Sequence, residues 1–247
     1  MGNGRQGKPN WLLSLLFGPN YGKPDVKRMQ AERDIPGLID ALSSREYGVS
    51  WPAATALIEL GAPAVEALVG RIDTADDTVR IAIARILGQI ADPRAVEPLV
   101  RLAKANYITL RQTAVYALTR FDSILSLHAL CEALADDDPG VQDMAATALQ
   151  SHADGRIVAT LIDMAQNPKA SVGVQTVLRL ALDRAAATVS TEDLRRAAQL
   201  NDSYVLIFAQ AETSCTFTTY NTTAEECDFS QIKQMARQEL IRRGLEA

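Results

Sequence analysis

The 247-residue chain has few of the residues that most often carry enzymatic chemistry. It contains two histidines and three cysteines, and aromatic residues make up 5% of it. The sequence also lacks the GxSxG nucleophile motif, the P-loop and the GxGxxG dinucleotide motif. Hydrolase and nucleotide-binding activities therefore have no supporting pattern, and we predict no catalytic residues.

The three cysteines, Cys131, Cys215 and Cys227, form neither a CxxC pair nor an even disulfide framework. No zinc or other metal site is expected from them. Cys131 lies in an apolar column and is predicted to be a core residue. Cys215 and Cys227 flank a Thr-rich segment with no neighbouring cations to activate a thiol, so we expect a structural or incidental role. The pattern favours a reducing compartment, and we predict a cytoplasmic protein.

The chain also lacks an excess of positive charge and a long apolar run. Its 25 Lys and Arg stand against 30 Asp and Glu, and the net charge of −5 gives no general attraction for nucleic acid or anionic lipid. The apolar stretch from Trp11 to Phe17 is far shorter than the roughly 20 residues that span a bilayer, and no small-residue cleavage site follows it. We therefore expect neither nucleic-acid binding nor stable membrane insertion.

An internal repeat dominates what is present. Three columns of apolar residues recur every 31 residues, with one interval of 30 at the start. The columns are Val49, Val79, Leu110, Val141 and Val172; Leu57, Leu87, Leu118, Leu149 and Leu180; and Leu38, Leu68, Leu99, Leu130 and Leu161. A fixed period of this length is typical of solenoid proteins, in which stacked copies share one core.

Each repeat is predicted to contain two helices, because apolar residues follow the i, i+3, i+4, i+7 pattern twice in each period. The break between the two helices is marked by Asp92-Pro93, where aspartate accepts free amide hydrogens and proline suits the first helical turn. Gly61 is suited to end the preceding helix in the earlier copy. Asp76-Asp77 and Asp136-Asp137-Asp138 occupy the starts of first helices and lack calcium-loop spacing, so we interpret them as caps.

The fold class that follows is all-α: an α-solenoid of about six helix pairs with capping helices at both ends. We predict an N-terminal tail with a short apolar capping segment over residues 1–24 and the solenoid over 25–212. Residues 213–247 should form a Thr-rich loop and a C-terminal capping helix, and one more helix is expected over Tyr204–Ala211. The segment Trp11–Phe17 either caps the first repeat or contacts a partner.

The phrase ADPRAVEPLVRL, preceded by VRIAIARILGQI, resembles the HEAT-like repeat in the variant associated with phycobilin lyases. The resemblance covers about residues 25–200. It implies a solenoid whose second helices line a concave face. Family members include bilin lyases, chaperone-like scaffolds, a diiron hydroxylase and alkylpurine DNA glycosylases, so the resemblance alone does not select a function.

The residues of this chain favour some of these functions over others. A diiron site of the hydroxylase type needs His-Glu pairs, but neither His128 nor His152 is followed by glutamate. We interpret His152 instead as a packed or capping residue. A glycosylase needs a basic groove, which the mixed charges of the second helices do not supply. A bilin lyase needs little more than a groove that holds a tetrapyrrole, so a bilin lyase-like or chaperone-like protein remains the alternative.

The main prediction is a non-enzymatic scaffold, without a cofactor, that binds another protein along the concave face of the second helices. On such a face outward residues of successive repeats form a strip, which here serves either docking or helical ion pairs such as Glu97 with Arg101. The candidate binding residues share this outward position: Glu66, Glu97, Arg101, His128, Glu132 and Asp163.

Overall fold

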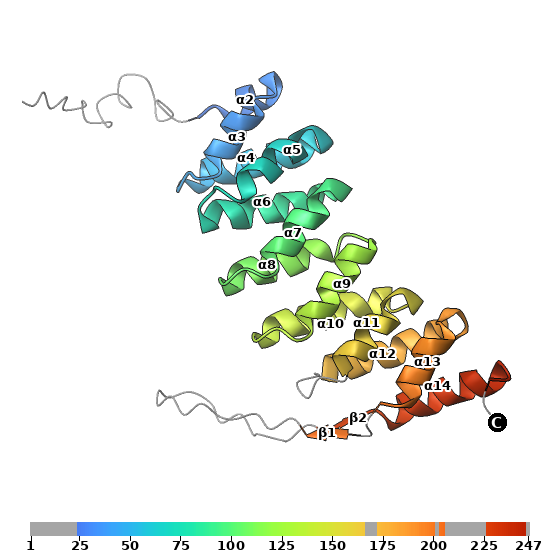
Figure 1. The fold of residues 1–247 in the computed structure, drawn as a ribbon. Coiled ribbons are helices and arrows are strands. Elements are labelled where there is room, and N and C mark those ends of the chain that lie inside the picture. Colours follow the sequence, from blue (N-terminus) through green and yellow to red (C-terminus); the bar gives the residue numbers. More distant parts are fainter. Residues whose placement is uncertain (1–23, 166–171, 201–202, 206–225, 246–247) are drawn as a thin grey trace, which may run out of the picture. The chain divides into compact units, whose positions relative to one another are not determined.

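The computed structural model describes residues 24–165, 172–200, 203–205 and 226–245. The chain divides into two compact units between Ile86 and Leu87, near the end of helix α6. Each unit consists of consecutive helix pairs, as the 31-residue period predicts (Figure 1).

The N-terminal unit contains two helix pairs and the greater part of α6. The pairs are α2 (Val26–Glu32) with α3 (Ile35–Ala41), and α4 (Tyr47–Leu60) with α5 (Ala62–Ile72), followed by α6 (Asp77–Ile90). First helix packs on first helix, α2 against α4, and second helix on second helix, α3 against α5. Leu38, Leu57 and Leu68 are fully buried in this unit, which places the predicted columns in its core.

The C-terminal unit continues the same pairing. Its elements are η1 (Pro93–Ala95) and α7 (Val96–Leu102), α8 (Ile108–Leu118), α9 (Ile124–Ala133), α10 (Pro139–His152), η2 (Gly155–Ile157), α11 (Val158–Ala165), α12 (Val172–Ala185), η3 (Ala186–Thr188), α13 (Thr191–Ala198), β1 (Ser203–Val205), β2 (Glu226–Asp228) and α14 (Ser230–Arg242). The first helices α8, α10 and α12 pack in sequence, and α14 closes against α12 and α13.

The core of the C-terminal unit contains the predicted leucine columns except Leu180, which is half-buried, whereas Leu178 and Leu182 of the same helix are in the core. Leu118 and Leu149 of the first helices and Leu99, Leu130 and Leu161 of the second helices are all fully buried. One helix pair could not bury such faces by itself, and each neighbour supplies the missing cover. The all-α solenoid repeat is therefore confirmed.

The helix starts follow the predicted capping pattern. The backbone N–H of Val79 donates to Asp76 Oδ1 at 3.0 Å, and that of Val141 donates to Asp138 Oδ1 at the same distance. Asp193 N–H likewise donates to Ser190 Oγ at 3.0 Å. The aspartate runs thus satisfy amide hydrogens that the first helical turn leaves without partners.

One predicted helix is wrong where the structure describes it. We expected a helix over Tyr204–Ala211, but Ser203–Val205 is strand β1, which pairs antiparallel with β2. Tyr204 lies opposite Cys227, and Val205 opposite Glu226. Aromatic and β-branched residues favour strands, and the partner that supplies the ladder lies more than 20 residues away, beyond the reach of a local pattern. Residues 206–211 lie outside the described part.

The structure does not test the predictions for two parts of the chain. Trp11–Phe17 and Cys215 lie outside the described residues. In the described part of the chain, no helix is both long and apolar enough to cross a bilayer.

A candidate docking row on the second helices

The second helices of the C-terminal unit lie side by side. Helix α7 packs against α9, α9 against α11, and α11 against α13 (Figure 1). Their apolar faces are buried, and their opposite faces carry the side chains that we predicted to be outward. We call the exposed face of α7, α9, α11 and α13 the second-helix row.

Ion pairs connect neighbouring repeats along this row. Lys104 Nζ, just after α7, lies 2.7 Å from Glu132 Oε2 on α9. Asp163 on α11 pairs with Arg196 on α13. Because exposed pairs contribute only about 0–1 kcal/mol each, they align the repeats without locking them.

The six predicted residues are all exposed, and the structure brings only some of them together. Glu97 Oε1 and Arg101 Nη1 on α7 lie 3.8 Å apart, which is the predicted i, i+4 pair. His128 points outward on α9, one turn before Glu132. Glu66 is exposed on α5 of the N-terminal unit, where Arg71 pairs with Asp40 of α3 at 2.8 Å.

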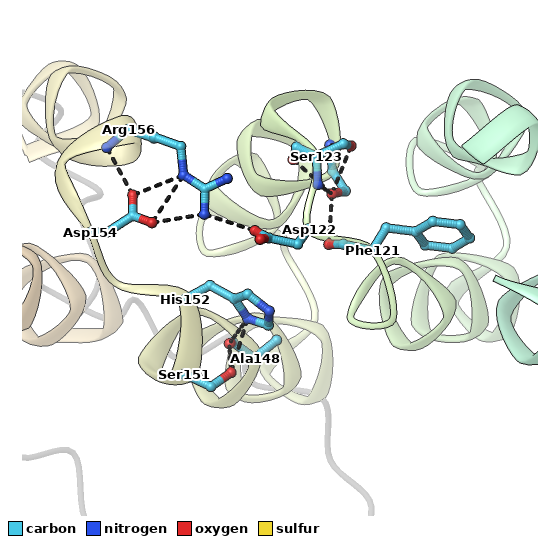
Figure 2. A network of polar contacts seen from close by, with 9 residues as sticks. Phe121, Asp122, Ser123, Ala148, Ser151, His152, Asp154 and Arg156 are labelled. Carbon is cyan, nitrogen blue, oxygen red and sulfur yellow. Dashed lines mark hydrogen bonds and ion pairs between the residues drawn. The ribbon is translucent and has the colours of Figure 1, made fainter. Parts of the chain in front are cut away.

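A polar network holds the turns next to the second-helix row (Figure 2). Arg156 on η2 donates to Asp154 Oδ2 at 2.7 Å and to Asp122 Oδ1 at 2.7 Å. Asp122 lies in the turn between α8 and α9, so one guanidinium bridges two repeats. Hydrogen bonds from Arg156 lower the pKa of the Asp154 carboxyl, and both carboxylates raise the pKa of Arg156. Asp154 and Arg156 therefore stay charged at any physiological pH.

The same turn motif occurs two repeats earlier. Arg94 Nη2 lies 2.9 Å from Asp92 Oδ2, and the Arg94 backbone N–H donates to Asp92 Oδ1 at 3.0 Å. These bonds hold the pKa of Asp92 at about 2. In the repeat between them, Ser123 takes the capping role and accepts from Ser126 N–H at 3.1 Å (Figure 2).

Neither histidine forms a catalytic pair in the structure. His152 is half-buried at the end of α10, where its Nδ1 lies 3.1 Å from Ala148 O and 2.9 Å from Ser151 Oγ (Figure 2). This is the packed or capping position that we expected. Cys131 is fully buried, and burial raises the pKa of its thiol to about 12, so it is a core residue as expected.

Another ion pair joins the start of α8 to the turn that follows α9. Arg111 on α8 donates twice to Asp136, with both N···O distances at 2.8 Å and with both side chains largely buried. Burial alone would raise the pKa of Asp136, but the hydrogen bonds from Arg111 outweigh it and the pKa is lowered. Arg111 also donates to the carbonyl of Ala105, so it fixes two loops together.

An open groove lies between α12 and α14. Its volume is about 400 Å³. The groove is lined by three glutamines, two apolar residues and one charge of each sign; the lining residues are Arg179, Leu180, Asp183, Gln231, Gln234, Met235 and Gln238. Its volume lies in the range of small-molecule sites, whereas its open and largely polar lining differs from the mostly apolar lining that is typical of such sites.

Sequence reasoning missed the inter-repeat partners of the row. Lys104 and Arg196 complete ion pairs with two predicted residues, yet neither was singled out. Their separations from Glu132 and Asp163 are 28 and 33 residues, not 31. A search for opposite charges within a few residues of one period would have found both pairs.

Comparisons with known proteins support the repeat interpretation. Residues 35–119 match the family model of HEAT repeats. A phycobilisome maturation protein of Synechococcus elongatus is 32% identical over 87 residues, which cover 35% of this chain and 42% of that protein. The phycocyanobilin lyase subunit beta of Pseudanabaena tenuis is 36% identical over 88 residues, covering 35% of this chain and 31% of that protein.

The chain thus spans less than half the length of these curated relatives. Among solved structures, a complex of CpcE and CpcF of phycocyanin lyase from a Nostoc species matches with 24% identity and a TM-score of 0.49. That match covers 60% of this chain and 98% of the other.

Proposed function

We propose that the chain is a non-enzymatic protein-binding module that acts in the maturation of a phycobiliprotein. The observation that carries the proposal is the second-helix row, in which successive repeats expose charged side chains at one face. The two curated relatives supply the kind of partner, since their names concern phycobilisome maturation and bilin attachment. The partner would contact Glu97, Arg101, His128, Glu132 and Asp163.

The ion pairs of the row suit a docking surface. The side chains of Glu97 and Arg101 keep 80% and 49% of their exposure, so their pair is already hydrated. Exchanging such a pair for one with a partner removes little stability from the free protein. The repeated helices remain rigid while the charged ends reorient.

The row carries both signs of charge, which suits orientation better than general attraction. Complementary charges across an interface mainly set specificity and the rate of association. A partner surface would therefore need both a basic patch opposite Glu132 and an acidic patch opposite Arg101. A uniformly charged macromolecule does not satisfy this requirement.

The test uses apo-phycocyanin as the probe and isothermal titration calorimetry as the measurement. We expect the Glu132→Lys variant to weaken binding at least tenfold, because the introduced lysine would face the basic patch of the partner. The matched control is Asp143→Lys on α10, a first helix outside the row. Equal effects of the two substitutions, or no binding by the wild type, would contradict the proposal.

The alternative, a bilin lyase-like or chaperone-like protein that handles a tetrapyrrole, is supported by the groove between α12 and α14. Arg179 supplies a cation for the propionate carboxylates of a bilin, and Leu180 and Met235 supply apolar contact. Titrating phycocyanobilin into the protein should then give a saturable shift of the absorption band. Arg179→Gln should weaken this response, whereas Arg195→Gln on α13 should leave it unchanged.

A further inference from the structure

The exposed apolar side chains of the described residues concentrate in one repeat. Of the eight large hydrophobic residues that the structure leaves exposed, five fall within α8, α9 and their adjoining turns. We call these five the α8–α9 patch: Tyr107, Ile108, Tyr116, Ile124 and Leu125, with exposures between 45% and 59%. Tyr107 and Ile108 lie at the start of α8, and Ile124 and Leu125 lie at the start of α9. Exposed apolar residues that share one helix face are typical of interaction sites, whereas scattered ones are not informative.

The repeat pattern does not require any of the five. At positions 31 residues before and after, the chain has only polar, charged or turn residues. Those equivalents are Asp76 and Asp138, Asp77 and Pro139, Arg85 and Thr147, Pro93 and Gly155, and Arg94 and Arg156. The patch is therefore specific to this copy, in a chain whose neighbouring copies have no large apolar residue at these positions.

Part of the patch forms a stripe along α8. Ile108, Gln112 and Tyr116 follow each other at intervals of four residues, so they share one side of the helix. Eight residues separate Ile108 from Tyr116, which is about 12 Å along the axis at a rise of about 1.5 Å per residue. Leu110 and Leu118 of the same helix are buried, so the stripe faces away from the core.

Opposite charges lie at the two ends of this stripe. The exposed Asp137 lies near the start of α8, because its neighbours Asp136 and Asp138 are bound by the first turns of α8. Arg111 donates to Asp136 at 2.8 Å, and Gln112 Nε2 donates to Asp138 Oδ1 at 3.0 Å. At the other end, Arg120 follows the last turn of α8 and is exposed.

We propose that the α8–α9 patch binds a second copy of this chain across a two-fold axis, with the two α8 helices antiparallel. A two-fold contact is self-complementary, so each residue pair occurs twice. The antiparallel arrangement places Arg120 opposite Asp137 of the partner subunit at both ends and packs Ile108 of each copy against Tyr116 of the other, with Gln112 at the two-fold axis. Tyrosine is enriched among the residues that dominate the affinity of interfaces, and Tyr116 is the most exposed residue of the patch, which makes it the principal contributor. This inference does not depend on the proposed partner of the second-helix row.

The first test is sedimentation equilibrium of the full chain over a wide concentration range. We expect reversible dimerisation of the wild type and at least a tenfold weaker dimer for Tyr116→Ala. Thr147→Ala, at the equivalent position of the next repeat, should dimerise like the wild type. Circular dichroism of each variant verifies that the helices remain folded. A wild type that stays monomeric at its highest soluble concentration overturns the proposal and leaves the patch to a different protein.

The second test exchanges the charges. Arg120→Glu alone places two acids opposite each other, and Asp137→Arg alone places two bases opposite each other, so each variant should be mainly monomeric. An equimolar mixture should form a heterodimer. In it, the acid introduced at position 120 of one variant meets the base introduced at position 137 of the other, and the native Arg120–Asp137 pair remains at the second contact. A mixture that is no more dimeric than its components rules out the two-fold arrangement.

Discussion

At the scale of single residues, three equivalent turn positions differ in backbone conformation. Gly61 and Ala91 both have positive φ, at 66° and 56°. Ala153 ends the first helix of a later repeat with φ at −65°. The left-handed region is unfavourable for alanine because its Cβ approaches the backbone carbonyl oxygen, whereas glycine has no Cβ. Ala91 therefore holds strain that the sequence, which has alanine at both 91 and 153, does not reveal.

Replacing Ala91 with glycine should stabilise the protein. We expect Ala91→Gly to raise the free energy of unfolding by about 0.5–1 kcal/mol, since relief of strain exceeds the added flexibility of the unfolded chain. Ala153→Gly is the comparison variant and should lower that free energy by at least about 0.5–1 kcal/mol, because the unfolded chain gains flexibility and the folded protein loses a buried methyl group. Urea denaturation measures both, and stabilisation by the second substitution would contradict the backbone assignment.

At the scale of elements, one glycine sets how closely two first helices approach. A Cβ built on Gly88 of α6 would lie 2.7 Å from the Cβ of Ala117 on α8 and 2.9 Å from its Cα. The nearest atoms are the Cβ and Cα of an alanine, so no flexible side chain could move aside. The two helices are held at a distance that only glycine permits.

Substituting this glycine should force the helices apart. We expect Gly88→Ala to lower the free energy of unfolding by roughly 1–3 kcal/mol through overpacking. The control is Gly70→Ala on α5, where no atom lies within 4 Å of the added Cβ. That substitution should stabilise by about 0.5–1 kcal/mol, as alanine does in exposed helix interiors. Thermal denaturation should therefore shift in opposite directions for the two variants.

The C-terminal helix is fastened by a buried carboxylate. Glu239 on α14 accepts from Arg242 Nη2 at 2.6 Å and from Arg243 Nε at 2.9 Å, and these bonds lower its pKa to about 2. Arg243 also donates to Ala186 O at 2.6 Å, which connects α14 to η3. The charge on Glu239 thus positions the arginine that joins the two elements.

This geometry predicts a pH dependence of stability. The folded pKa of Glu239 lies below its ordinary value of 4.5, so its contribution is complete above that pH and is lost as the pH falls towards 2. The melting temperature of Glu239→Gln should start lower at neutral pH and decline less steeply between pH 4.5 and 2. Glu192→Gln, an exposed position on α13, should follow the wild type. Parallel curves for wild type and Glu239→Gln would exclude this role.

At the scale of the whole molecule, the sequence predicted the features that repeat and missed those that do not. The leucine columns and the caps at Asp76 and Asp138 were predictable because each is a local signal. Strand β1 was missed because its partner β2 is distant in sequence.

The inter-repeat ion pairs were missed for a different reason. Long side chains such as Lys104 and Arg196 reach across repeats, so their partners do not keep the 31-residue period. The apolar α8–α9 patch was not singled out either, although comparing each column for exceptions would have found it. Cytoplasmic localisation, the domain boundaries and the role of Trp11–Phe17 stay predictions.

The bridge from Arg156 to Asp122 has a consequence for how such a chain evolves. Repeat proteins ordinarily gain or lose whole copies, because equivalent units can exchange neighbours. Deleting residues 108–138 would bring the α10–α11 turn beside the turn between α6 and α7. That turn has Ala91 at the position equivalent to Asp122, so Arg156 would lose its second acceptor. Arg111 and Asp136 would be removed together. Neighbouring copies are therefore no longer interchangeable in this chain, because each of these contacts needs a particular neighbour.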